Sequence, residues 1–277
     1  METVLITGAT SGIGIESAVQ LAPGRRMVLV GRNGARLAAA ATRVRDAQAR
    51  EVDTLLADFS SLASVRDLAC GVLSRYDTLD VLINNAGAVF PTRTETVDGY
   101  EATFAVNHLS PYLFTELVKP LVVGATPGRI VVTASTGHYR GDLDFGDLHY
   151  RRGYSIMKAY NRSKLANVLY VRSLAAELAD AGVTVNAVHP GMVATGIWDG
   201  APWFARPMVA LVKRLRMITP EEGGRRLTSL AVDPDFAVTT GGYFEDGQLR
   251  EPSATARDSG VGQRLRVVSD ELAGLRP

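Results

Sequence analysis

The sequence predicts a single α/β domain, in which a doubly wound parallel sheet of seven strands carries helices on both faces. Short apolar runs typical of buried strands alternate along the chain with longer segments of helical periodicity. Strict alternation of this kind gives parallel strands joined by crossover helices. The 277 residues are enough for one large core, and no linker-like stretch divides them. We therefore expect residues 1–277 to form one Rossmann-type domain.

The predicted strands are short apolar runs, and the predicted helices fill the intervals between them. The strands lie at 4–7, 27–30, 53–57, 79–84, 129–133, 183–188 and 242–244. The helices lie at 12–22, 34–49, 62–75, 99–122, 158–180 and 219–231. Ligands of such sheets bind beyond the carboxyl ends of the strands, so functional residues should directly follow strands.

Three segments depart from this alternation. Residues 137–157 form an insertion between the fifth strand and its helix. Residues 196–218 include Trp198 and Trp203, and we expect an apolar substrate lid there, although a packing helix would have similar spacing. The charged C-terminal tail at 248–277 could fold over the active-site mouth or extend away from the domain.

Composition and charge exclude several classes of partner. The net charge is +1, which gives no electrostatic case for nucleic acid or an anionic membrane. Cys70 is the only cysteine, so no internal disulfide can form and a reducing, cytoplasmic location is expected. The first strand begins close to Met1, and no later run of about 18 apolar residues follows, so we expect neither a signal peptide nor a membrane anchor.

A glycine-rich loop joins the first strand to the first helix. Its sequence is ThrGlyAlaThrSerGlyIleGly at 7–14. Gly8 permits a tight turn, whereas Gly12 and Gly14 let the backbone approach a pyrophosphate at the helix N-terminus. We place Thr10, Ser11 and Ile13 in the same cofactor-binding loop. The spacing GxxxGxG differs from the usual GxGxxG, and an ordinary tight turn is the alternative.

The end of the second strand predicts which dinucleotide binds. An NAD site usually has an acidic residue there for the ribose 2′-hydroxyl. This chain has Arg32 followed by Asn33, and a guanidinium can hold a 2′-phosphate. We therefore predict NADPH/NADP⁺, with a solvated surface arginine as the alternative. After the third strand, Asp58 and Phe59 are expected near the adenine, although Asp58 could instead cap the next helix.

Tyr160 and Lys164 are the candidate proton-transfer pair. They lie four residues apart in a predicted helix, so they share one face. A nearby ammonium favours the phenolate and lowers the pKa of a tyrosine from its ordinary value near ~10. Tyr160 could then act as a general acid or base, although a surface Tyr–Lys contact would have the same spacing.

Five sequence blocks together resemble the short-chain dehydrogenase/reductase family over about residues 3–245. They are ThrGlyAlaThrSerGlyIleGly at 7–14, AsnAsnAlaGly at 84–87, a serine after the fifth strand, Tyr160-x-x-x-Lys164, and ProGlyMetValAlaThr at 190–195. The resemblance implies that Tyr160 exchanges a proton with the substrate oxygen and that Lys164 tunes it and binds the nicotinamide ribose. It also implies that Ser135 binds the carbonyl or alkoxide oxygen and that Asn107 holds a water linked to Lys164.

The resemblance assigns further residues to the cofactor. Those implied near the adenosine ribose or the nicotinamide are Asn84, Ala86, Gly87, Pro190, Gly191, Val193 and Thr195.

Thr133 and Thr136 remain alternatives to Ser135 as the hydroxyl donor. His108 and His138 are expected to be ordinary core or surface histidines, and the histidines and acids lack metal-ligand spacing, so no metal site is predicted.

Several features resemble the retinol dehydrogenase-like branch of this family. Among them are the wide spacing of Ser135 and Tyr160 and the segments at 98–109, 163–169, 188–193 and 219–224. The branch implies a ketoreductase or alcohol dehydrogenase that acts on a carbonyl or secondary alcohol of a bulky apolar small molecule. The absent N-terminal anchor and the ThrAlaSer sequence at 133–135 depart from the branch and leave the substrate open.

Two other functions remain as alternatives, and self-association is possible. A nucleotide-sugar epimerase or dehydratase would use a similar Tyr–Lys pair, but usually has GxxGxxG and a larger C-terminal domain. A non-catalytic regulator that senses NADPH would tend to lose Tyr160 or Lys164. A homodimer or homotetramer could form through the helices at 99–122 and 158–180.

Overall fold

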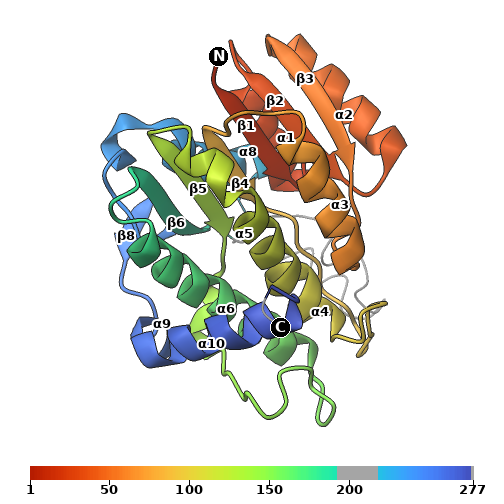
Figure 1. Cartoon of the computed structure of the whole chain (residues 1–277), viewed down its shortest axis with the longest axis vertical. Coiled ribbons are helices and arrows are strands. Elements are labelled where there is room, and N and C mark those ends of the chain that lie inside the picture. The colour runs from red at the N-terminus through yellow and green to blue at the C-terminus, as the bar shows by residue number, and fades with distance from the viewer. Residues whose placement is uncertain (192–217, 276–277) are drawn as a thin grey trace.

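A single eight-stranded sheet forms the centre of the molecule, and the computed structural model describes residues 1–191 and 218–275 (Figure 1). The strand order is β3-β2-β1-β4-β5-β6-β7-β8. The strands are β1 (Thr3–Thr7), β2 (Arg26–Gly31), β3 (Glu51–Leu56), β4 (Val81–Asn84), β5 (Gly128–Thr133), β6 (Val183–His189), β7 (Tyr243–Glu245) and β8 (Gln248–Arg250). The neighbours from β3 to β7 pair in parallel, which confirms the predicted doubly wound α/β fold.

The strand count corrects the sequence-based prediction. An eighth strand, β8, pairs antiparallel with β7 in the segment that was assigned to the tail. All three residues of β8 are exposed, so they form no apolar run that would mark a strand. The turn between the two strands is Asp246-Gly247, and both residues have positive φ. An Asp-Gly pair of this kind is a recognised two-residue hairpin signal, and it was available in the sequence.

The sheet reverses its winding at β1, whose five residues are all buried. Leu5 pairs with Val28 of β2 on one side and with Leu82 of β4 on the other. In a doubly wound sheet, a crevice opens at this reversal, outside the carboxyl ends of the central strands. The ends of β1, β4, β5 and β6 therefore define where a ligand can be held.

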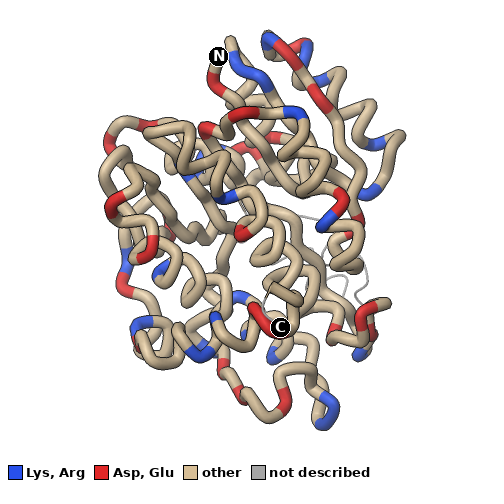
Figure 2. The backbone as a smooth tube through the Cα atoms, in the orientation of Figure 1, with Lys and Arg blue, Asp and Glu red and all other residues tan. Residues whose placement is uncertain are grey.

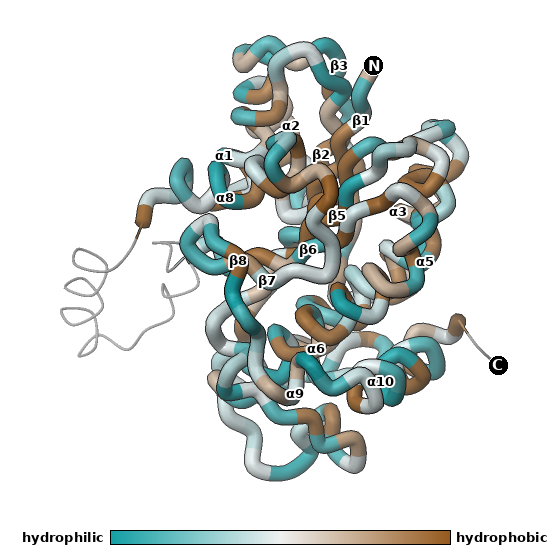
Figure 3. Tube along the Cα trace, turned by 90° about the vertical axis from the view of Figure 1, so that its left-hand side faces the viewer, coloured by the Kyte–Doolittle hydropathy of each residue, from teal (hydrophilic) through white to brown (hydrophobic). Residues whose placement is uncertain are grey.

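Two layers of helices cover the sheet, as the side view in Figure 3 shows. One layer contains α1, α2 and α8, and the other contains α3, α5 and α6. The α-helices are α1 (Gly12–Leu21), α2 (Gly34–Asp46), α3 (Leu62–Leu73), α4 (Ala102–Phe104), α5 (Ser110–Val123), α6 (Ile156–Glu177), α8 (Pro220–Val232), α9 (Ala254–Arg257) and α10 (Ser259–Leu272). Lys and Arg are interspersed with Asp and Glu along the backbone (Figure 2). Among the described helices, none is both long and apolar enough to cross a bilayer.

The predicted helix at 99–122 is interrupted. A π-helical segment, η1 (Ala105–Leu109), joins α4 to α5. Two 3₁₀ segments, η2 (Thr136–Arg140) and η5 (Pro234–Phe236), follow β5 and α8. Single π-turns inside helices are frequent at functional sites, and Asn107 lies at the centre of this one.

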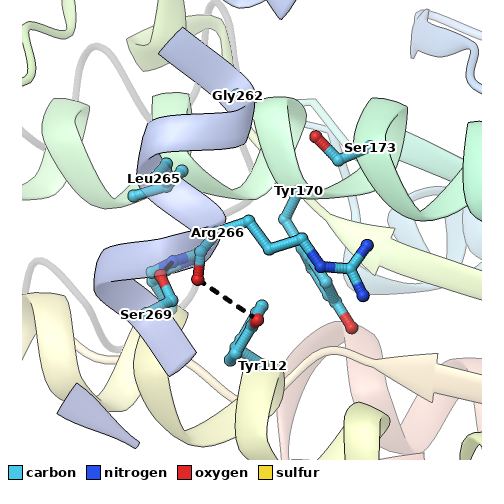
Figure 4. Close-up of a pocket in the computed structure, with 8 residues that line it drawn as sticks. Tyr112, Tyr170, Ser173, Gly262, Leu265, Arg266 and Ser269 are labelled. Carbon is cyan, nitrogen blue, oxygen red and sulfur yellow. Dashed lines mark hydrogen bonds between the residues drawn. The ribbon is translucent and has the colours of Figure 1, made fainter. Parts of the chain in front are cut away.

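The C-terminal tail neither trails free nor remains without structure. Its main helix, α10, packs against α6 (Figure 1). The Tyr112 hydroxyl of α5 hydrogen-bonds to Asp270 and also lies 3.5 Å from the Arg266 carbonyl, the contact dashed in Figure 4. Arg66 of α3 donates to the Gly274 carbonyl over 3.2 Å. The tail therefore covers part of the helix surface through which self-association was predicted.

Candidate active site

The glycine-rich loop has no room for side chains at two of its positions. A Cβ on Gly8 would lie 2.9 Å from the Ala86 Cα, and a Cβ on Gly14 would lie 2.2 Å from the Gly8 carbonyl oxygen. Helix α1 starts at Gly12, and the side chain of its N-cap residue, Ser11, makes no capping hydrogen bond. The first amides of a helix are donors without intrahelical partners, so this end of α1 can hold an anion.

Asn85, which the sequence analysis did not assign to the site, holds this loop. Its Nδ2 donates to the carbonyls of Thr7 (3.2 Å) and Gly8 (3.4 Å). The Thr7 hydroxyl in turn accepts from the backbone amides of Asn85 and Ala86, each at 3.0 Å. The glycine-rich loop and the AsnAsnAlaGly segment are therefore fixed to each other as one unit.

Asn84, which was assigned to the cofactor site, lies on the other face of the sheet. Its Nδ2 donates to the Thr115 hydroxyl of α5 over 2.7 Å. Side chains alternate along a strand, so Asn84 shares the α5 face with Leu82, whereas Asn85 follows the opposite alternation toward the glycine-rich loop. This alternation is the signal by which Asn85 could have been found. Gly87 lies beyond it, where a Cβ would approach the Asn107 Oδ1 to 3.2 Å.

The ends of β2 and β3 carry the residues predicted to contact the adenosine half. Arg32 is exposed and makes no side-chain hydrogen bond or ion pair within residues 1–191 and 218–275. Asn33 caps α2 by accepting from the Arg36 amide at 2.9 Å. Asp58 accepts from both the amide and the hydroxyl of Ser60, at 2.9 and 2.7 Å, so it stabilises a local turn. The Phe59 ring is buried against Phe114, and its carbonyl accepts from the Ser110 hydroxyl over 2.6 Å, so the ring is not available to a ligand.

Tyr160 and Lys164 share a face of α6, as predicted. Lys164 is 5% exposed, and its Nζ donates to the Thr133 carbonyl at the end of β5 over 2.9 Å. Burial lowers the pKa of this ammonium to about 8. The Nζ lies 5.7 Å from the centre of the Tyr160 ring. The lysine is thus anchored to the sheet beneath the tyrosine.

The pKa of Tyr160 differs from the expectation that Lys164 lowers it. Burial of the phenol raises its pKa, and the interaction with the Ser135 hydroxyl is what lowers it. The reason is that the buried phenolate is poorly solvated, and the Lys164 ammonium is directed to a backbone carbonyl. In this structure Ser135 therefore favours the ionised form of Tyr160.

Of the three candidate hydroxyl donors, Ser135, Thr133 and Thr136, it is Ser135 that interacts with Tyr160. It caps η2, and its Oγ accepts from the Gly137 amide over 3.1 Å. The Thr133 hydroxyl donates instead to Asn85 (3.4 Å). Gly137 packs closely on α6, where a Cβ would lie 2.6 Å from Asn161 Oδ1 and 3.3 Å from the Tyr160 ring. The start of η2 therefore holds Ser135 and Tyr160 against each other.

Asn107 joins the π-turn to α6. Its Oδ1 accepts from the Ala88 amide at 2.7 Å, and its Nδ2 donates to the Ala88 carbonyl at 3.0 Å and to the Ser163 hydroxyl at 3.1 Å. Ser163 donates to the Tyr160 carbonyl over 2.7 Å. Asn107 thus fixes the turn of α6 that carries Tyr160.

The residues that follow β6 pack against Ile218 and against α8. The Pro190 carbonyl accepts from Arg226 over 3.3 Å, and a Cβ on Gly191 would lie 2.6 Å from Ile218. Val193, Thr195 and the predicted lid up to residue 217 lie outside the described residues.

The insertion at 137–157 is fastened by Arg162, which lies between Tyr160 and Lys164 in sequence. Arg162 is 2% exposed and pairs with Asp142 at 2.9 Å. It also donates to the carbonyls of Asp142 (3.1 Å) and Asp147 (2.5 Å), and it stacks on the Tyr150 ring at 3.7 Å. One buried guanidinium therefore ties this loop to the helix that carries the catalytic pair.

These features define a dinucleotide-dependent enzyme site at the carboxyl end of a doubly wound sheet. Three features together fit a phosphorylated dinucleotide: the loop in which Gly8 and Gly14 leave no space for side chains, the uncapped N-terminus of α1, and Arg32, which has no side-chain partner among the described residues. Tyr160, Lys164 and Ser135 meet at the end of β5, where proton transfer is possible.

The profile of the short chain dehydrogenase family matches residues 2–202, and the chain belongs to this family of oxidoreductases, which implies a nicotinamide cofactor and a small-molecule substrate. It is 38% identical to "Retinol dehydrogenase 14" of Mus musculus over 288 residues, covering 99% of this chain and 86% of that protein. It is also 38% identical to the "Putative daunorubicin C-13 ketoreductase DnrU" of Streptomyces sp. (strain C5), covering 98% and 92%. The structure of the Pseudomonas aeruginosa RhlG/NADP active-site complex aligns with a TM-score of 0.70 at 25% identity, covering 94% of this chain and 96% of that one.

Proposed function

We propose that this protein is an NADPH-dependent carbonyl reductase that acts reversibly on a ketone, or the matching secondary alcohol, of a bulky apolar small molecule. The observation that carries the proposal is the group of Tyr160, Ser135 and Lys164, in which a partly exposed phenol and a serine hydroxyl lie on either side of Gly137, near a buried ammonium. Asn107 supports the group from the π-turn.

In the reductive direction, each residue has a defined task. NADPH, held by the glycine-rich loop and Arg32, would supply the hydride for the carbonyl carbon and leave as NADP⁺. Tyr160 gives its hydroxyl proton to the carbonyl oxygen, which becomes the alcohol, and the resulting phenolate is reprotonated from solvent. Ser135 donates a hydrogen bond to the same oxygen as its negative charge develops. Lys164, whose ammonium lies on the same helix face, would bind the nicotinamide ribose.

The cofactor preference rests on Arg32. Arg32 follows β2, is exposed and has no side-chain partner among the described residues. An unpaired guanidinium at this position can hold a 2′-phosphate through two hydrogen bonds, whereas the 2′-hydroxyl of NADH offers it much less. The NADP named in the RhlG complex is consistent with this preference.

The size of the substrate is inferred from the relatives and from the insertion. The names of two relatives refer to retinol and to a daunorubicin ketone, and both molecules are large and mainly apolar. In this chain, the loop tied by Arg162 lies directly against the helix of Tyr160. An ordered wall beside the catalytic tyrosine suits a substrate larger than the reacting carbonyl.

The chemistry is tested by Tyr160→Phe in the full chain. A panel of bulky ketones and aldehydes is offered with NADPH, and NADPH consumption is measured. We expect the variant to lose at least about a hundredfold in kcat, as is typical for loss of a general acid, with the binding of NADPH retained. Unchanged turnover would remove Tyr160 from the mechanism. Binding of NADPH without turnover of any panel member by the native protein would favour a cofactor-sensing protein instead.

The cofactor preference is tested by Arg32→Ala, with Arg45→Ala as the matched control at the other end of α2. Both arginines are exposed. We expect Arg32→Ala to weaken NADPH binding about tenfold to a hundredfold, the usual range for a charge-assisted contact, and to leave NADH binding unchanged. Arg45→Ala should change neither. Native protein that binds NADH more tightly than NADPH would contradict the preference.

A further inference from the structure

His138 is a fully buried histidine with two hydrogen bonds of fixed direction. It is 0% exposed and lies in η2, three residues after Ser135. Its Nδ1 lies 2.7 Å from the Ser135 carbonyl oxygen. Its Nε2 lies 3.3 Å from the backbone amide of Ser253. The imidazole therefore bridges the catalytic segment and a part of the chain 115 residues away.

These two partners determine which ring nitrogen carries the proton. A backbone carbonyl can only accept, so Nδ1 must donate to Ser135. A backbone amide can only donate, so Nε2 must accept from Ser253. Both bonds exist together only in the neutral tautomer with its proton on Nδ1. Burial also lowers the pKa of His138, which is consistent with a neutral ring.

Two aromatic rings hold the imidazole in this position. The Tyr139 ring lies 4.0 Å from it and the Tyr243 ring 4.4 Å, measured between ring centres. The Tyr139 hydroxyl donates to the Glu251 carbonyl over 3.0 Å. We call residues 251–253, which connect β8 to α9, the C-terminal arm. Segment η2 is thus fastened to the C-terminal arm by His138 and by Tyr139, but only the His138 connection reaches Ser135.

The Ser135 carbonyl is held almost entirely by His138. It accepts from the His138 side chain at 2.7 Å and from the His138 amide at 3.1 Å. Fixing this carbonyl fixes the peptide plane after Ser135, and so limits the directions in which the serine hydroxyl can point. That hydroxyl accepts from the amide of Gly137, which packs on the Tyr160 ring, and its interaction with Tyr160 lowers the pKa of the phenol.

We propose that His138 is a positioning residue that orients Ser135 toward Tyr160 through its hydrogen bond to the Ser135 carbonyl. The proposal rests on the proposed function for its kinetic consequence, because Ser135 acts on the substrate oxygen there. The positioning of Ser135 beside Tyr160 by His138 does not depend on a substrate and can be measured in the protein alone.

The kinetic test compares three variants of the full chain. His138→Phe keeps a ring between Tyr139 and Tyr243 but removes both hydrogen bonds. His138→Asn keeps a donor near the place of Nδ1 and loses the bond to Ser253. Tyr139 is 43% exposed, and Tyr139→Phe removes only the hydrogen bond from its hydroxyl to the Glu251 carbonyl in the C-terminal arm. Circular dichroism and the thermal midpoint establish that each variant is folded.

We expect kcat to fall at least about tenfold in His138→Phe, with the NADPH dissociation constant unchanged. Complete loss of an oxyanion donor costs about a hundredfold or more in kcat, and His138→Phe only misorients the donor. His138→Asn should recover most of kcat, and Tyr139→Phe should match the native protein. The proposal is overturned if His138→Phe turns over normally, or if Tyr139→Phe loses as much as His138→Phe.

A spectroscopic test separates this proposal from the proposed function. Tyrosine labelled with ¹³C at Cζ reports the ionisation of each phenol by NMR, and Tyr160→Phe identifies the Tyr160 signal. Because Ser135 lowers the pKa of Tyr160, both Ser135→Ala and His138→Phe should shift the Tyr160 titration to higher pH. Tyr139→Phe should leave it in place. If His138→Phe titrates like the native protein, His138 does not position Ser135, whether or not any substrate is found.

Discussion

The glycine-rich loop and the segment that carries Ser135 flank the same crevice but are held in different ways. The loop is held by backbone groups, by the absence of side chains at Gly8 and Gly14, and by one asparagine, Asn85. The catalytic segment is held by large side chains, among them Arg162 and His138, whose partners come from the insertion and the C-terminal arm. The first arrangement depends on close approach of backbone to backbone, whereas the second depends on the hydrogen bonds and ring contacts of large polar side chains.

The largest expected effect is at the glycine-rich loop, in Gly14→Ala. A Cβ there would lie 2.2 Å from a backbone oxygen that cannot rotate away. Overpacking of this kind costs typically about 1–3 kcal/mol, and we expect the upper end together with loss of measurable NADPH binding. Isothermal calorimetry measures the binding of NADPH, and urea unfolding measures the free energy of unfolding. Gly34→Ala is the control, because a Cβ on Gly34 meets nothing within 4 Å. Native-like binding by Gly14→Ala would show that the loop adapts.

On the catalytic side, Arg162→Met should loosen the insertion. The change removes a buried guanidinium that binds Asp142 and the Asp147 carbonyl. Hydrogen bonds to charged groups are worth about 1.5–3 kcal/mol each, and we expect a loss near 2–3 kcal/mol because Asp142 stays hydrated. Trypsin should cleave faster after the exposed Arg151 and Arg152, as mass spectrometry can establish. Arg172→Met, on the same helix but exposed, should change neither quantity.

The buried His108 should make the interface between the tail and helices α5 and α6 sensitive to acid. Burial lowers the pKa of His108 to about 4, against an ordinary value of 6.5, and its ring contacts Asn167 and Ser269. In the unfolded chain the His108 imidazole takes up a proton below about pH 6.5, whereas in the folded chain it does so only near pH 4. Stability is therefore complete above pH 6.5 and falls as the pH decreases toward 4. Between pH 7 and pH 5 the loss should be about 2 kcal/mol. Urea unfolding at both pH values should give a smaller difference for His108→Gln.

The smallest effect is expected at the contact between α5 and α10. Tyr112→Phe removes a hydroxyl that bonds to Asp270 and approaches the Arg266 carbonyl, while the ring stays packed (Figure 4). We expect a loss of about 1 kcal/mol in the free energy of unfolding. Because this contact lies away from the crevice, kcat should not change. A fall in kcat equal to that of His138→Phe would mean that the whole tail, and not His138, controls the site.

The same difference explains which parts of the site could be predicted. The glycines, Tyr160 and Lys164 were found because their spacing reflects a local requirement. Asn85 and β8 were missed although strand alternation and the Asp246-Gly247 turn would have indicated them. The regions predicted as strands and helices otherwise match the sheet and its two layers closely.

Helix α10 was also missed despite a helical pattern. Val261, Leu265, Val268 and Leu272 have the spacing of one helix face, and Asp258 caps the helix by accepting from the amides of Gly260 and Val261. The roles of His138 and Arg162 are different, since no local pattern indicates a partner such as Ser253 or Asp147. Nor could the sequence show that burial raises the pKa of Tyr160 and that Ser135, rather than Lys164, lowers it.

The docking of the tail has a consequence for the order in which the chain can fold. The bond from Arg66 to the Gly274 carbonyl joins residues that are 208 positions apart in the sequence. During synthesis, the sheet and both helix layers can assemble before these last residues leave the ribosome. Because α10 follows every other described helix and strand in the chain, the apolar face of α6 that it covers stays exposed until this helix has been synthesised and can dock.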